Sequence, residues 1–170
     1  HGSHAAHGST QREPQHYEAI YFIGREVNMA KLINNSSSAT QAIKKVAVIG
    51  AGTMGAGIAG QVANAGVEVW LLDLPSQGDA VNALSENGLK RLKNVDSPGL
   101  MSKDAAALIH CGNTEDDFHQ LADCDWIAEA VVERLDVKHA LYKRINQVAN
   151  PKAIVTSNTS TIPISLLTQG

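Results

Sequence analysis

The stretch from Lys45 to Asp73 constrains the fold of this chain more than any other segment. It opens with the uniformly apolar run 46–49, which is typical of a parallel strand buried on both faces. A helix rich in small residues, about 54–64, and a second β-rich run at 67–72 follow. Strand, helix and strand within about 29 residues predict one βαβ unit.

The turn between the first strand and the helix is rich in glycine. It reads Gly50-Ala51-Gly52-Thr53-Met54-Gly55. In such a motif the first glycine permits a tight turn, the second lets a pyrophosphate approach the backbone, and the third allows the helix to pack closely on the strand. The start of the helix adds unpaired N–H groups and a partial positive charge. We predict that this loop binds a dinucleotide; the alternative is a turn that only connects two elements.

Asp73 ends the second strand and completes the fingerprint. A carboxylate at this place accepts hydrogen bonds from the adenosine ribose hydroxyls and repels a 2′-phosphate. An NADP site usually has Arg or Lys nearby, and the segment 74–78 supplies neither. The predicted cofactor is therefore NAD rather than NADP. FAD is a weaker alternative, because no further flavin motif follows.

Helices and strands alternate along the rest of the chain. Helices are expected over 79–94, 103–109, 135–148 and 163–167, and strands over 110–114, 126–132 and 153–157. This alternation predicts an α/β domain with a Rossmann-like, doubly wound, mainly parallel sheet and helices on both faces. The domain is expected to span residues 45–170.

Residues 1–44 differ in character from this domain. His1, His4 and His7 lie among Gly, Ser and Ala, which resembles the remnant of an affinity tag; metal binding by them is a weaker alternative. The polar cluster 34–38 is linker-like. We expect residues 1–44 to be a tag, a linker or a loosely attached extension.

Composition argues against several classes of partner. A formal net charge of −3 gives no reason to expect nucleic acid or an anionic membrane. No apolar run approaches the roughly 20 residues that span a bilayer, so no membrane insertion is expected. Cys111 and Cys124 fit no common zinc spacing, which predicts no metal site and two buried thiols in a reducing compartment.

Three sequence blocks in a fixed order carry a family resemblance. They are KVAVIGAGTMGAGIA, IAEAVVERLDVKHALYKRI and SNTSTIPI. Together they resemble the NAD-binding domain of the 3-hydroxyacyl-CoA dehydrogenase family, which includes enzymes of fatty-acid β-oxidation and 3-hydroxybutyryl-CoA dehydrogenases. The resemblance covers about residues 45–170. It implies an NAD-dependent oxidoreductase that reversibly oxidises the 3-hydroxyl of a 3-hydroxyacyl-CoA.

The resemblance also implies roles for single residues. Glu133 matches a residue near the nicotinamide ribose, and Lys138 matches a lysine on the cofactor side of the cleft. Asn158 matches a residue near the nicotinamide, and Ser160 matches the serine that hydrogen-bonds the substrate's 3-oxygen. The alternatives are a first-turn helix acid for Glu133, a solvated lysine for Lys138, and turn or capping residues for the other two.

A basic cluster on the helix expected at 79–94 is a further candidate. Lys90, Arg91 and Lys93 lie on its last turns. The family's coenzyme A contacts this region, so the resemblance implies that these side chains bind its phosphates. A solvated basic helix end is the alternative.

The chain departs from the family pattern at its end. In the family a histidine within Gly-x-His-Phe-Phe-Asn-Pro, downstream of the serine, acts as general base. His110, His119 and His139 match no part of that motif, and the chain stops at Gly170. We expect a fragment that binds NAD with little or no turnover, without the helical C-terminal domain through which the parent would form a homodimer.

The parent enzyme is expected to be cytoplasmic if bacterial, and mitochondrial or peroxisomal if eukaryotic. Two other functions stay open at this point. One is the NAD-binding domain of another 3-hydroxyacid dehydrogenase. The other is a non-catalytic NAD-sensing module.

Overall fold

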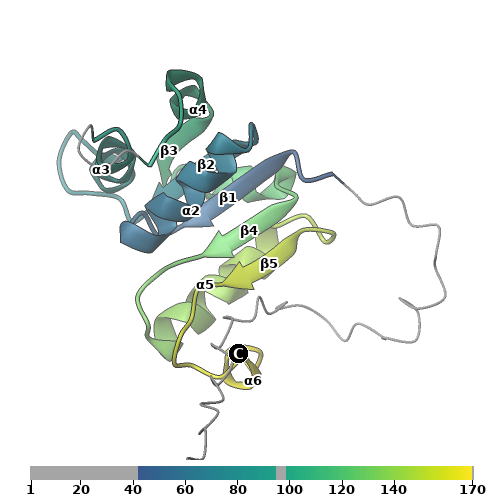
Figure 1. The fold of residues 1–170 in the computed structure, drawn as a ribbon. Helices are drawn as coiled ribbons and strands as arrows, with labels where there is room; N and C mark the ends of the chain where they lie inside the picture. The colour runs from purple at the N-terminus through teal and green to yellow at the C-terminus, as the bar shows by residue number, and fades with distance from the viewer. Residues whose placement is uncertain (1–41, 95–98, 170) are drawn as a thin grey trace, which may run out of the picture.

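The computed structural model describes residues 42–94 and 99–169, so the expectation for the N-terminal extension falls almost entirely outside it. Within these residues the strands form one parallel sheet in the order β3-β2-β1-β4-β5 (Figure 1). The strands are β1 Lys45–Ile49, β2 Glu68–Asp73, β3 Ile109–Asn113, β4 Trp126–Glu129 and β5 Ile154–Ser157. This order is the predicted doubly wound, Rossmann-like arrangement, which is therefore confirmed.

Helices cover both faces of the sheet (Figure 1). They are α2 Thr53–Asn64, α3 Ala83–Leu92, α4 Lys103–Ala107, the 3₁₀ helix η1 Phe118–Asp123, α5 Leu135–Val148 and α6 Ile164–Leu167. The residues of β1 alternate between two hydrophobic clusters. Val46 and Val48 pack with α2 on one face, while Ala47 and Ile49 pack with α5 and η1 on the other. The central strand is thus buried on both faces, as its uniformly apolar sequence predicts.

The carboxyl ends of the strands meet at one edge of the sheet. Ile49 is paired in register with Leu72 of β2 on one side and with Glu129 of β4 on the other, and Glu129 is paired with Ser157 of β5. The chain leaves β1 for α2 on one face and leaves β4 for α5 on the opposite face. Open α/β sheets bind their ligands in the crevice at such a switch point.

Two boundaries differ from the predicted ones by three residues or more, and one helix was not predicted. The helix expected from residue 79 begins at Ala83, because the Val81 carbonyl accepts the N–H of Ser76 and closes a loop. The strand expected over 126–132 ends at Glu129, because its carboxylate accepts the N–H of Val131 and turns the chain. The η1 helix was not predicted, because six residues of mixed character show no helical period.

Candidate functional site

The glycine loop has the geometry that a phosphate loop requires. Gly50 has a φ of +103°, and a Cβ at this position would lie 2.4 Å from the Ala130 carbonyl oxygen. A Cβ at Gly55 would lie 1.7 Å from the Gly50 carbonyl oxygen, so only glycine lets α2 start this close to the strand. An added Cβ at Gly52 would meet nothing within 4 Å. The loop therefore has open space at the one glycine that is predicted to face a pyrophosphate.

The start of α2 is suited to an anion. Gly52 is the N-cap residue and offers no side chain to the first-turn amides, and the first turn contains no acidic residue. Thr53 and Met54, which follow it, are exposed. Uncapped first-turn N–H groups and the positive end of the helix dipole both favour a bound phosphate.

Asp73 lies directly beside this loop. One carboxylate oxygen, Oδ2, accepts the N–H of Ala51 at 2.6 Å, and Oδ1 accepts the N–H of Leu74 at 2.7 Å. A carboxylate has about four acceptor sites, so acceptor capacity remains for ribose hydroxyls. The side chain is half-buried, so part of it is open to solvent beside the loop.

Arg91 also contacts the glycine loop, which the sequence did not indicate. Its Nη2 donates to the Ala51 carbonyl oxygen at 2.5 Å. Helix α3 packs against the loop here, since a Cβ at Gly88 would lie 3.0 Å from the same oxygen. Arg91 is 40 residues from Ala51 in the chain, and no local pattern reports such a tertiary contact.

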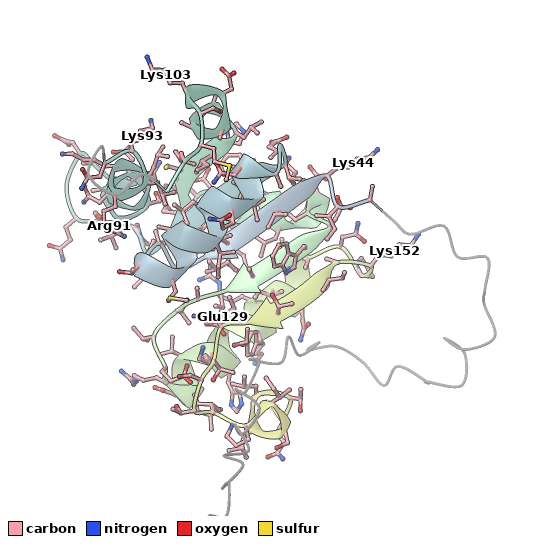
Figure 2. The ribbon with its side chains drawn as sticks, in the orientation of Figure 1. Lys44, Arg91, Lys93, Lys103, Glu129 and Lys152 are labelled. Carbon is pink, nitrogen blue, oxygen red and sulfur yellow. The ribbon has the colours of Figure 1, made fainter. Side chains whose placement is uncertain are left out.

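A network of buried charged and polar side chains lies at the carboxyl ends of β4 and β5. Glu129 and Lys138 are both 0% exposed, and the lysine Nζ lies 2.7 and 2.8 Å from the two carboxylate oxygens. The hydroxyls of Tyr142 and Ser157 donate to the same carboxylate at 2.6 and 2.5 Å. Burial and the neighbouring Glu129 carboxylate raise the pKa of Tyr142 far above its usual range. The network joins the end of β4, where Figure 2 labels Glu129, to the end of β5 and to α5.

Glu133 connects this network to the loop after β5. Its Oε2 lies 3.3 Å from the Lys138 ammonium. Its Oε1 accepts the backbone N–H groups of Ser160 and Thr161 at 3.0 Å each and the hydroxyl of Thr159 at 2.6 Å. Partial burial alone would raise the pKa of Glu133, but these hydrogen bonds outweigh it and hold the pKa well below its usual range.

The structure brings the predicted site residues together in two groups. Gly50–Gly55 and Asp73 lie at the ends of β1 and β2, whereas Glu133, Asn158 and Ser160 lie at the ends of β4 and β5. The backbone N–H of Asn158 donates to the Glu129 carbonyl at 2.7 Å, and the Ser160 side chain is exposed.

The structure excludes one of the two predictions for Lys138. The alternative of a solvated lysine is wrong, because its side chain is fully buried. Its ammonium contacts Glu129 and Glu133 rather than an open cleft. Any effect of Lys138 on a cofactor is therefore predicted to act through Glu133. Glu129 itself was missed, since a glutamate in an apolar strand gives no signal of its partners.

Other candidate residues lie away from this edge. The Nε2 of His139 lies 2.7 Å from the Leu166 carbonyl oxygen, and that of His110 lies 3.4 Å from a Glu68 carboxylate oxygen. Cys124 is buried as expected, whereas Cys111 is only half-buried. Within 42–94 and 99–169, no helix is long and apolar enough to cross a membrane.

Comparison with known proteins identifies relatives of the same kind. Residues 45–170 match the family model for the NAD-binding domain of 3-hydroxyacyl-CoA dehydrogenase. A probable 3-hydroxyacyl-CoA dehydrogenase of Deinococcus radiodurans is 48% identical over 130 residues, which cover 75% of this chain and 37% of the relative. A 3-hydroxyadipyl-CoA dehydrogenase of Escherichia coli is 35% identical over 130 residues, covering 74% of this chain and 26% of the relative.

Solved structures agree with these relatives. The crystal structure of FadB2 from M. tuberculosis has a TM-score of 0.62 and 36% identity, covering 75% of this chain and 45% of that one. The 3-hydroxybutyryl-CoA dehydrogenase of Escherichia coli has a TM-score of 0.61 and 31% identity, covering 74% and 26%. The chain spans less than half the length of these relatives. It belongs to the 3-hydroxyacyl-CoA dehydrogenase family and carries the NAD-binding domain of that family.

Proposed function

We propose that this domain is the cofactor half of an enzyme that interconverts 3-hydroxyacyl-CoA and 3-oxoacyl-CoA. One observation carries the proposal. The glycine loop with Asp73, and the loop 158–161 that hydrogen-bonds to Glu133 (the serine loop), lie along the same carboxyl edge of the sheet. Two of the relatives are named as a 3-hydroxyacyl-CoA and a 3-hydroxyadipyl-CoA dehydrogenase, which favours this function over an NAD-sensing module. NAD, when bound, supplies the hydride acceptor at C4 of its nicotinamide.

The two groups of residues along the carboxyl edge have different proposed roles. The amides at Gly52–Gly55 hold the pyrophosphate, and Asp73 accepts hydrogen bonds from the adenosine ribose. Glu133 and Asn158 line the nicotinamide half. The Ser160 hydroxyl is exposed and makes no hydrogen bond to any described residue, so it is available to the substrate's 3-oxygen. Lys90 and Lys93, exposed at the end of α3, are candidate contacts for the phosphates of coenzyme A.

Oxidation of a hydroxyl also needs a base that takes its proton. Of the three described histidines, His139 is engaged with Leu166, His110 with Glu68 and His119 with Asp116, and none has a hydrogen bond to the serine loop. We therefore propose that the base and the acyl-binding surface come from the additional length that the relatives have. A dimer through that additional domain, and a cytoplasmic location in a bacterium, complete the proposal for the parent enzyme.

Calorimetry with the present chain tests the proposal. NAD is expected to bind with a one-to-one stoichiometry, and Asp73→Ala is expected to weaken NAD by about tenfold, as for the loss of hydrogen bonds to a charged group. With acetoacetyl-CoA and NADH the chain alone is expected to show negligible turnover. Absence of NAD binding by the folded chain would refute the cofactor site. Enzyme-like rates would refute the proposed origin of the base.

A further inference from the structure

The backbone of Ala51 contacts two opposite charges. Its N–H donates to the Asp73 carboxylate at 2.6 Å, and its C=O accepts from the Arg91 guanidinium at 2.5 Å. The two side chains come from the end of β2 and from the last turn of α3. Both therefore sit at the adenosine half of the predicted dinucleotide site, where the ribose hydroxyls are expected.

Among the residues that the structure describes, few groups use the hydrogen-bonding capacity of the Arg91 guanidinium. A guanidinium carries five N–H donors in a planar fork that matches phosphate geometry. Within the described residues the Arg91 side chain makes one hydrogen bond, to Ala51, and no ion pair. The residue is exposed at this end of the sheet, and Figure 2 shows it between α3 and the start of α2. The contact with Ala51 fixes the guanidinium beside the loop and leaves its other donors to a ligand.

We propose that Arg91 is a specificity residue that contacts a phosphate on the 2′-oxygen of the adenosine ribose. This inference rests on the proposed function, because it requires the dinucleotide to lie on the glycine loop. Asp73 repels a 2′-phosphate and favours NAD. Arg91 offsets part of that repulsion, so the site binds NADP measurably, although more weakly than NAD. The segment 74–78 lacks a cation, and α3 supplies one from elsewhere in the chain.

Dissociation constants for NAD and NADP, measured by calorimetry at one ionic strength, test the proposal. Arg91→Ala is expected to weaken NADP by about tenfold and NAD by less than about threefold, the size of one lost charge-assisted hydrogen bond. Arg91→Lys keeps the charge and is expected to retain most of the NADP affinity. Lys103→Ala is the control, since Lys103 is exposed on α4, carries the same charge and has no side-chain hydrogen bond or ion pair among the described residues.

The same measurement in an Asp73→Asn background separates the two charges. Removing the carboxylate is expected to raise NADP affinity relative to NAD. Adding Arg91→Ala is expected to reverse that gain, whereas adding Lys103→Ala is not. An effect of Arg91 through the loop conformation would weaken both cofactors equally. An unchanged ratio of the two dissociation constants therefore overturns the inference and leaves NAD binding intact. Failure of the wild-type chain to bind NAD overturns the proposed function and this inference together.

Discussion

The ammonium of Lys138 lies 2.7 and 2.8 Å from the two carboxylate oxygens of Glu129, and neither side chain is exposed to solvent. Burying two charges has a large desolvation cost, which their mutual attraction offsets only with good geometry and further hydrogen bonds. Tyr142, Ser157 and the N–H of Val131 provide those further bonds to Glu129. The pair is thus stable as a unit and sensitive to the loss of either member.

Lys138→Met is expected to lower the free energy of unfolding by about 3–5 kcal/mol, because it leaves a buried carboxylate without its cation. Urea unfolding followed by circular dichroism measures the change. Lys143→Met on the exposed side of α5 is the control, and is expected to stay within about 0.5 kcal/mol of the wild type. A Lys138→Met protein as stable as the control would contradict the buried pair.

The hydrogen bonds that Glu133 accepts predict a pH dependence of the folding stability. Hydrogen bonds from the 159–161 segment hold the folded-state pKa of Glu133 below its ordinary value of 4.5. A carboxyl group with a lowered folded pKa stabilises the folded state above the unfolded pKa, and this contribution is lost as the pH falls below it. The stability difference between wild type and Glu133→Gln is therefore expected to be largest near pH 7 and to shrink below about pH 4.5. Thermal unfolding of both proteins across this pH range measures the stability difference. A difference that does not depend on pH would contradict stabilisation by the ionised Glu133 carboxylate.

Two neighbouring hydroxyls on the serine loop are expected to behave differently. Thr159 donates to Glu133 at 2.6 Å, so Thr159→Val is expected to cost about 1 kcal/mol of stability. The Ser160 hydroxyl has no partner within the described residues, so Ser160→Ala is expected to leave both unfolding and NAD affinity unchanged. Urea unfolding and calorimetry of the two variants make the comparison. Equal losses of stability would show that Ser160 is structural rather than available to a substrate.

The glycines of the loop and of α2 are predicted to separate folding from binding. Gly52→Ala adds a Cβ in open space at a φ of −63°, so it is expected to fold normally and to lose NAD affinity. Gly55→Ala places a Cβ within 1.7 Å of the Gly50 carbonyl oxygen and is expected to destabilise the fold itself. Gly57→Ala meets no atom within 4 Å and is expected to stabilise α2 by about 0.5–1 kcal/mol. Melting temperatures and NAD titrations check all three, and a Gly52→Ala variant with full NAD affinity would argue against pyrophosphate binding there.

Local signals in the sequence predict the elements whose cause is local. The strand at 46–49 and the helix at 135–148 are found where the apolar pattern places them. The glycine loop was predicted because its requirements, a tight turn and a close approach, act within a few residues. The early end of β4 was not, because it depends on how the Glu129 carboxylate turns back on Val131.

The parts of the site that depend on contacts between distant residues could not be predicted from the sequence for the same reason. Arg91 and Ala51 are 40 residues apart in the chain. Lys138, Tyr142 and Ser157 lie 9, 13 and 28 residues after Glu129, and all three hydrogen-bond to its carboxylate. A pattern with period 2 or 3.6 indicates which face a residue is on, but not which polar groups converge there. The segment 74–78 contains no Lys or Arg, but the fold brings Arg91 to the glycine loop from α3.

Glu133 fixes the serine loop before any ligand is bound, because it accepts the loop's own N–H groups. Ordering a flexible segment at the moment of association would subtract conformational entropy from the binding free energy. Here that entropy is lost when the chain folds, so a substrate meets a serine whose backbone is already in place. Association at this half of the edge is then expected to proceed without a slow loop-ordering step.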